Sequence, residues 1–186
     1  LHLSIRRQRQ MCIRDRRSVH ESCPATKFIV SGFSQGAVIA GDVADEIGGG
    51  QGAVPAESIA GVALIADGRR QNGVGQNPGR KVGGVGAEIA LQPVSGLVQP
   101  IVPGASMRGA RPNGFGSLAD RTFQICAPND SVCDAPPNVS NALERAQGLI
   151  AANGVHAQYA SNSGVIDGTT ANQWVVGWAR QLIDAA

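Results

Sequence analysis

The sequence predicts an α/β domain built on a parallel sheet. Residues 27–33 and 59–66 are short, apolar and rich in β-branched side chains, which is typical of buried strands. Between them, the apolar positions of residues 34–47 recur at helical spacing and stop at three consecutive glycines. A strand, a helix and a second strand within about 40 residues form the βαβ unit from which parallel sheets are assembled.

The second half of the chain adds one strand and two helices. Residues 121–127 are predicted to form the third strand, and residues 141–152 a helix that ends before Gly154. The last helix begins at a capping box formed by Thr170 and Gln173. We expect its apolar face to be buried against the sheet; that face carries Trp174, Trp178 and Leu182.

Residues 68–118 lack a clear period and are rich in glycine and proline. They carry too many apolar side chains for a disordered linker, so two interpretations stay open. One is a packed run of short strands and turns, and the other is a wall or lid over a binding site.

Composition and charge exclude several classes of protein. The chain has 186 residues, of which 42% are hydrophobic and 16% charged, as expected of a single globular domain. No apolar run approaches the roughly 18 residues that span a bilayer. The first 17 residues carry six arginines against one aspartate, whereas the remainder is net acidic and has no basic cluster of the kind that binds nucleic acid.

We interpret residues 1–17 as a non-native extension and residues 18–186 as the domain. The extension lacks the apolar segment of about 7–15 residues that a signal peptide needs. Its "MCIRDR" resembles translated sequencing adapter. A basic tail for nucleic acid or lipid is the alternative.

Two of the four cysteines are predicted to form a disulfide. Cys126 and Cys133 are too far apart for a typical zinc-ligand pair, and the chain has no second pair, so neither a metal nor a cofactor is expected. A disulfide closing this short loop implies an oxidising compartment, hence export to the cell envelope or beyond. Cys12 lies in the extension, and the partner of Cys23 stays open.

Residues 32–36 read Gly-Phe-Ser-Gln-Gly and place Ser34 between a predicted strand and a helix. G-x-S-x-G alone is weak evidence, but in this context it is typical of the nucleophile elbow of α/β-hydrolases. Such a turn projects the serine Oγ above the sheet, and the N–H of Gln35 then points to where an oxyanion would form. The alternative is that Ser34 simply caps the helix.

A nucleophilic serine needs a histidine base and an acid that orients it. In this fold the chain order is serine, acid, histidine, and only His156 follows Ser34. Asp130 and Asp67 each follow a predicted strand and are the two candidate acids. We favour Asp130, because the loop between Cys126 and Cys133 would hold its carboxylate in place; Asp67 would otherwise be a turn residue near two arginines.

Other ligand motifs are absent from the sequence. Gly84-Val85-Gly86 starts like a dinucleotide-binding loop but has Ile89 where the third glycine belongs. Neither lysine follows a glycine, so there is no Walker loop.

On these motifs the chain resembles the cutinase family of serine esterases, and most closely the cutinase-like proteins of actinobacteria whose envelopes contain mycolic acids. The resemblance rests on "CPATKFIVSGFSQGAVIAGD", "CAPNDSVC" and "GVHAQY" and extends from about residue 22 to the C-terminus. It implies a secreted α/β-hydrolase, a three-layer sandwich, that cleaves esters of lipids, polyesters or acylated polysaccharides without a cofactor. It also implies that Asp130 is the acid inside the Cys126–Cys133 disulfide.

Compared with that family, the upstream strands are missing, together with the loop that donates the second oxyanion N–H. We therefore expect a fragment with a complete triad, half an oxyanion hole and an unpaired sheet edge. The predicted function is ester hydrolysis by Ser34, His156 and Asp130. The alternatives are a non-catalytic lipid- or glycan-binding protein on a hydrolase scaffold, and an inactive fragment. The sequence does not identify the acyl chain, the alcohol, the acyl acceptor or the oligomeric state.

Overall fold

The computed structural model describes residues 2–101, 107–151 and 154–185. Its centre is a parallel sheet of three strands in the order β1-β2-β3, formed by Phe28–Phe33, Ile59–Ile65 and Thr122–Ile125. Val30 lies beside Val62, and Leu64 beside Gln124. The three predicted strands are confirmed, although the third is shorter than expected.

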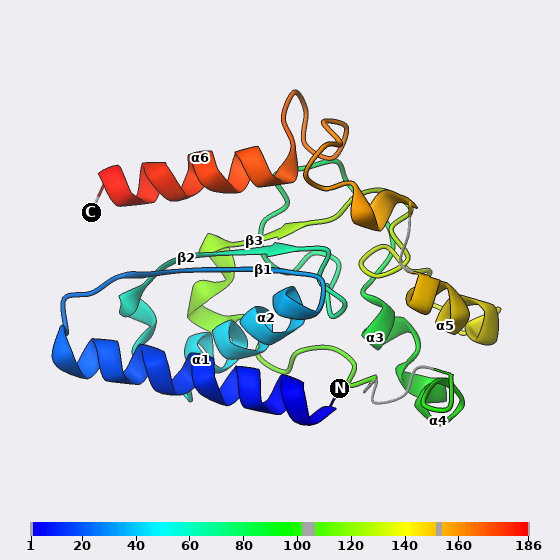
Figure 1. The fold of residues 1–186 in the computed structure, drawn as a ribbon, viewed down its shortest axis with the longest axis horizontal. Coiled ribbons are helices and arrows are strands. Elements are labelled where there is room, and N and C mark those ends of the chain that lie inside the picture. Colours follow the sequence, from blue (N-terminus) through cyan, green and yellow to red (C-terminus); the bar gives the residue numbers. More distant parts are fainter. Residues whose placement is uncertain (1, 102–106, 152–153, 186) are drawn as a thin grey trace.

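Helices cover both faces of this sheet, as Figure 1 shows. Helix α2 (Gln35–Gly48) and helix α1 (His2–Ser22) lie on one side, and α6 (Ala171–Asp184) lies on the other. Alternation along β2 explains the two cores, because successive side chains of a strand point to opposite faces. Val62 and Leu64 pack against α2, whereas Ile65 belongs to the core on the α6 side. The predicted α/β sandwich with a parallel central sheet is therefore confirmed.

Helix α6 starts at the predicted capping box, in which Thr170 Oγ1 accepts from the Gln173 N–H at 3.2 Å. Its two tryptophans stack on each other with ring centroids 5.9 Å apart and face the sheet. The close approach of helix α6 to strand β2 depends on Gly61, because a Cβ there would lie 2.5 Å from the Trp178 ring. The prediction that Trp174, Trp178 and Leu182 are buried is only partly right, since all three stay half-exposed.

Residues 68–101 and 107–118, the described part of the glycine-rich segment, do not form a run of short strands. They contain α3 (Ala87–Ala90), η2 (Gln92–Val94), α4 (Ser95–Val98) and the start of η3 (Gly116–Arg121), with only isolated bridges at Gln76 and Val85. A buried arginine satisfies two backbone carbonyls of this segment. Arg69 donates to the carbonyls of Gly109 and Ala110 at 2.8 and 3.0 Å.

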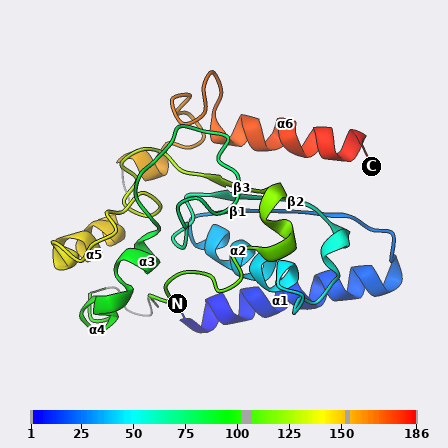
Figure 2. The same ribbon diagram turned by 180° about the vertical axis from the view of Figure 1, so that it is seen from behind.

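The remaining elements are η1 (Ala56–Ser58), α5 (Ala142–Ala151) and η4 (Gly154–Ala157). The predicted end of α5 at Ala152 lies outside the described residues. Helices α3, α4 and α5 gather beyond the carboxyl ends of the strands in both views (Figures 1 and 2). No helix in the described part of the chain is both long and apolar enough to cross a membrane.

Helix α1 runs without interruption across the predicted domain boundary between residues 17 and 18. It contacts α2 through an ion pair between Arg9 and Glu46, and Ile13 packs against the core beneath. The interpretation of residues 1–17 as a non-native extension stays a prediction.

Candidate functional site

Ser34 occupies a strained turn between β1 and α2. Its φ of 53° and ψ of −120° are unusual for a residue with a Cβ. The Ser34 N–H continues the sheet by donating to the Ile65 carbonyl at 2.9 Å. The side chain does not cap α2, which contradicts the simpler interpretation of this serine. Ser34 Oγ instead lies 3.0 Å from Nε2 of His156, a residue 122 positions away in the sequence.

The two glycines of the motif differ in what they do. A Cβ on Gly32 would lie 2.3 Å from the Gly36 carbonyl oxygen, so only glycine lets α2 fold back this closely on β1. A Cβ on Gly36 would meet nothing within 4 Å. Close packing of α2 on β1 therefore requires glycine at position 32 but not at position 36.

His156 lies on η4 and joins Ser34 to Asp130. Its Nδ1 is 3.1 and 3.0 Å from the two carboxylate oxygens of Asp130, while its Nε2 faces Ser34. His156 is 8% exposed and Asp130 1% exposed, so the carboxylate is shielded from water. The structure thus brings together the serine, histidine and aspartate that the sequence singled out, at the carboxyl edge of the sheet.

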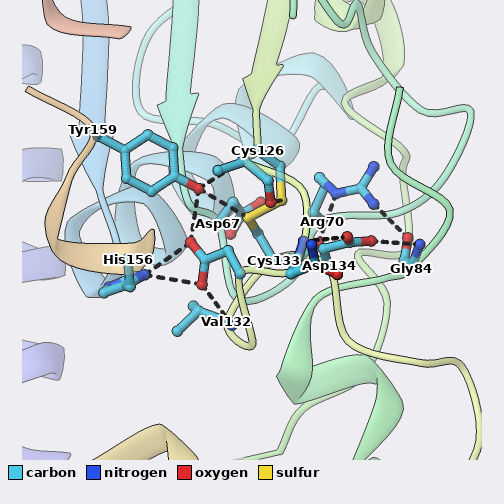
Figure 3. Close-up of a disulfide and its surroundings, with 12 residues drawn as sticks. Asp67, Arg70, Gly84, Cys126, Val132, Cys133, Asp134, His156 and Tyr159 are labelled. Carbon is cyan, nitrogen blue, oxygen red and sulfur yellow. Dashed lines mark hydrogen bonds and ion pairs between the residues drawn. A yellow bond between two sulfur atoms is a disulfide. The ribbon is translucent and has the colours of Figure 1, made fainter. Parts of the chain in front are cut away.

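Asp130 lies inside the loop closed by the Cys126–Cys133 disulfide. Figure 3 shows this disulfide with Tyr159 beside it. The two carboxylate oxygens of Asp130 accept hydrogen bonds from the Val132 N–H at 2.9 Å and from the Tyr159 hydroxyl at 2.7 Å. Burial alone would raise the pKa of Asp130, but the hydrogen bonds from His156, Tyr159 and Val132 outweigh it and lower that pKa. Asp130 is therefore held as a carboxylate.

Asp67, the other candidate acid, belongs to a different cluster. It is fully buried, and both its oxygens accept from the terminal nitrogens of Arg111, at 2.6 and 3.1 Å. It also accepts from the Arg69 N–H at 3.0 Å, as expected of a turn residue. Arg111 and Arg69 both reach Asp42 on α2, so the cluster ties the irregular segment to that helix.

Sequence reasoning missed two aromatic residues of the site. Phe33 stacks on His156 with ring centroids 5.1 Å apart, and Tyr159 donates to Asp130. Both residues lie close in the sequence to a predicted catalytic residue: Phe33 directly precedes Ser34, and Tyr159 follows His156 by three residues. Nothing in a single sequence distinguishes such neighbours from ordinary core residues.

The surroundings of Ser34 are suited to stabilising negative charge. Gln35 is the first residue of α2, and the first N–H groups of a helix have no partner within it. The helix dipole adds partial positive charge at the same end. Within the ranges that the structure describes, no three His, Cys, Asp or Glu side chains come together to hold a metal ion.

Comparison with known proteins identifies the family of this chain. The family model described as "Cutinase" matches residues 7–177. A curated relative, the "Carboxylesterase Culp6 homolog" of Corynebacterium glutamicum, is 65% identical over 167 residues, which are 90% of this chain and 54% of the relative. A solved cutinase-like protein from Cryptococcus sp. superposes with a TM-score of 0.54 at 26% identity, covering 84% of this chain and 63% of that structure. The chain therefore spans about half the length of the curated relative, and it belongs to the cutinase family.

Proposed function

We propose that this chain is a carboxylic ester hydrolase that works through an acyl-enzyme on Ser34. The observation that carries the proposal is the hydrogen-bonded row from Ser34 Oγ to His156 Nε2 at 3.0 Å and from His156 Nδ1 to Asp130 at 3.0 and 3.1 Å. A relative named a carboxylesterase and a solved cutinase-like structure support it.

The reaction would begin with attack of Ser34 Oγ on the ester carbonyl carbon while the hydroxyl proton passes to His156 Nε2. Asp130 would accept from Nδ1–H, fixing the tautomer and stabilising the imidazolium. The Gln35 N–H would donate to the oxyanion of the tetrahedral intermediate. Cleavage of the ester C–O bond would release the alcohol with the proton from His156. A water molecule would then repeat these steps on the acyl-enzyme.

The proposed substrates are carboxylic esters of lipids, polyesters or acylated polysaccharides. Phe33, which is 45% exposed beside His156, offers apolar surface for such a substrate. The disulfide supports export to the cell envelope or beyond, because disulfides persist in oxidising compartments.

The test is covalent labelling by a fluorophosphonate, read by intact mass. Ser31 provides a matched control, since it is an exposed serine on β1, the strand that leads into Ser34. We expect one adduct in the wild type and in Ser31→Ala, and none in Ser34→Ala. Circular dichroism with a cooperative melt would establish that each variant is folded. Labelling that persists in Ser34→Ala, or a folded wild type that takes no label, would overturn the proposal. Saturable ligand binding without turnover would then favour a binding protein.

A further inference from the structure

The hydroxyl of Tyr159 touches the Asp130 loop at its beginning, middle and end. It accepts from the Ala127 N–H at 2.9 Å, donates to Asp130 Oδ2 at 2.7 Å, and lies 3.3 Å from Cys133 Sγ. Tyr159 is 3% exposed and belongs to the core beneath this loop. Figure 3 shows its ring beside the disulfide and close to His156. A single buried phenol thus ties together a loop whose ends are already joined by a disulfide.

This contact fixes the carboxylate that faces the histidine. The Val132 N–H holds Oδ1 of Asp130, and the Tyr159 hydroxyl holds Oδ2. With one donor on each oxygen, the carboxylate plane keeps both oxygens near His156 Nδ1. Without Tyr159, Oδ2 would keep only its contact with the histidine, and the carboxylate could turn away from Nδ1.

We propose that Tyr159 is a positioning residue for the Ser34–His156–Asp130 array, whose hydroxyl fixes the Asp130 carboxylate against His156. This inference rests on the proposed function for its kinetic consequence. Its structural core, a tyrosine that keeps Asp130 in hydrogen-bonding position against His156, can be tested without turnover.

The charged groups around the hydroxyl support a donor that stays protonated. Burial and the negative charge of Asp130 raise the pKa of Tyr159, and they outweigh the Ala127 N–H and Arg70, which lower it. Asp134 and Asp67 act on Arg70, which lies toward the far side of the disulfide. Asp130 itself faces His156 and Tyr159, and His156 faces Ser34 and the Phe33 ring. Tyr159 therefore remains a donor across the neutral range.

The ring and the hydroxyl can be separated experimentally. The Tyr159 ring packs edge-on against Phe33 and His156, with centroids 5.7 and 6.3 Å apart. Tyr159→Phe keeps this ring and removes only the hydroxyl. The chain contains a single tyrosine, so growth on 3-fluorotyrosine changes this position alone. The fluorinated phenol is more acidic and donates more strongly.

The two changes are read from the proton NMR signal of the His156 Nδ1–H group, which depends on its hydrogen bond to Asp130. Tyr159→Phe should broaden or remove this signal, because the carboxylate is no longer held against Nδ1. The kcat for a p-nitrophenyl ester should fall on the order of tenfold with KM unchanged. Fluorotyrosine keeps the geometry but draws charge from Asp130, so it should move the signal upfield without removing it.

Thr122→Val is the matched control, because it removes a fully buried hydroxyl that donates to the Leu118 carbonyl at 2.8 Å, at the opposite end of β3 from the site. It should lower the melting temperature without changing the Nδ1–H signal of His156. If Tyr159→Phe does not fold, the fluorotyrosine protein decides alone, since it keeps every hydrogen bond. A His156 Nδ1–H signal that is unmoved by fluorotyrosine, or that changes equally in Thr122→Val, would overturn the proposal. Absence of ester turnover with these NMR changes intact would refute only the proposed function.

Discussion

Arg111 binds Asp67 through both terminal guanidinium nitrogens, at 2.6 and 3.1 Å, in a pair from which water is excluded. The pair joins the irregular segment to the residue that follows β2, and Asp42 extends it to α2 through Arg111 Nε at 3.1 Å. The two aspartates that each follow a strand therefore have different structural roles. Asp67 helps to hold the scaffold, and Asp130 faces His156.

Substitution of each aspartate by asparagine should distinguish the structural role of Asp67 from the catalytic role proposed for Asp130. Asp67→Asn leaves Arg111 buried with only Asp42 as a charged partner, and should cost about 3 kcal/mol of unfolding free energy. Asp130→Asn should keep most of the stability but reduce kcat about 10⁴-fold, because the wrong histidine tautomer is then favoured. Urea unfolding and esterase kinetics of both variants measure this. Equal kinetic losses at similar stability would contradict the assignment.

The elbow glycines offer a second matched pair. Gly32→Ala forces a Cβ against the Gly36 carbonyl, so about 1–3 kcal/mol of stability and the fluorophosphonate labelling should be lost. The Cβ added by Gly36→Ala would point into open space at the start of helix α2. The free energy of unfolding should therefore stay unchanged or rise by up to about 1 kcal/mol, and the melting temperature should not fall. Thermal melts of the two variants decide. Equal destabilisation would show that the turn does not depend on the close approach at Gly32.

Removing the disulfide should loosen the loop that carries Asp130. Replacing Cys126 and Cys133 with serine removes a cross-link between residues seven apart, worth about 2–3 kcal/mol in the chain-entropy account. Labelling of Ser34 should slow as well, since Asp130 lies within the loop. Cys23→Ser is the control, because Cys23 is exposed and unpaired. Unchanged labelling in the double variant would mean that Tyr159 and Val132 hold Asp130 by themselves.

Acid should weaken the fold through Asp130. Its pKa is lower in the folded chain than the value of 3.8 expected when unfolded. Its ionisation therefore stabilises the fold above that unfolded value, and this contribution disappears as the pH falls through the lower folded value. The difference in unfolding free energy between wild type and Asp130→Asn should shrink from about pH 6 to about pH 3. A difference that is constant across this range would contradict the depressed pKa.

Much of the fold was readable from local pattern. Apolar periodicity located β1, α2 and β2, and the pairing of Thr170 with Gln173 located the start of α6. These signals work because hydrogen bonding within a helix, and alternation along a strand, depend on residues that are neighbours in the sequence. The G-x-S-x-G motif between a strand and a helix singled out Ser34, and chain order then singled out His156, because it is the only histidine that follows Ser34.

Tertiary contacts decided the rest. Asp67 and Asp130 both follow a strand, and the sequence favoured Asp130 only through its loop between two cysteines and the family resemblance. The folded chain places Arg111 beside Asp67, and His156 with Tyr159 beside Asp130. The irregular segment is also held by an arginine side chain that reaches a carbonyl about 40 residues away, as Arg69 reaches Gly109. Such pairings offset the cost of burying charge only after the chain has folded, so no local pattern encodes them.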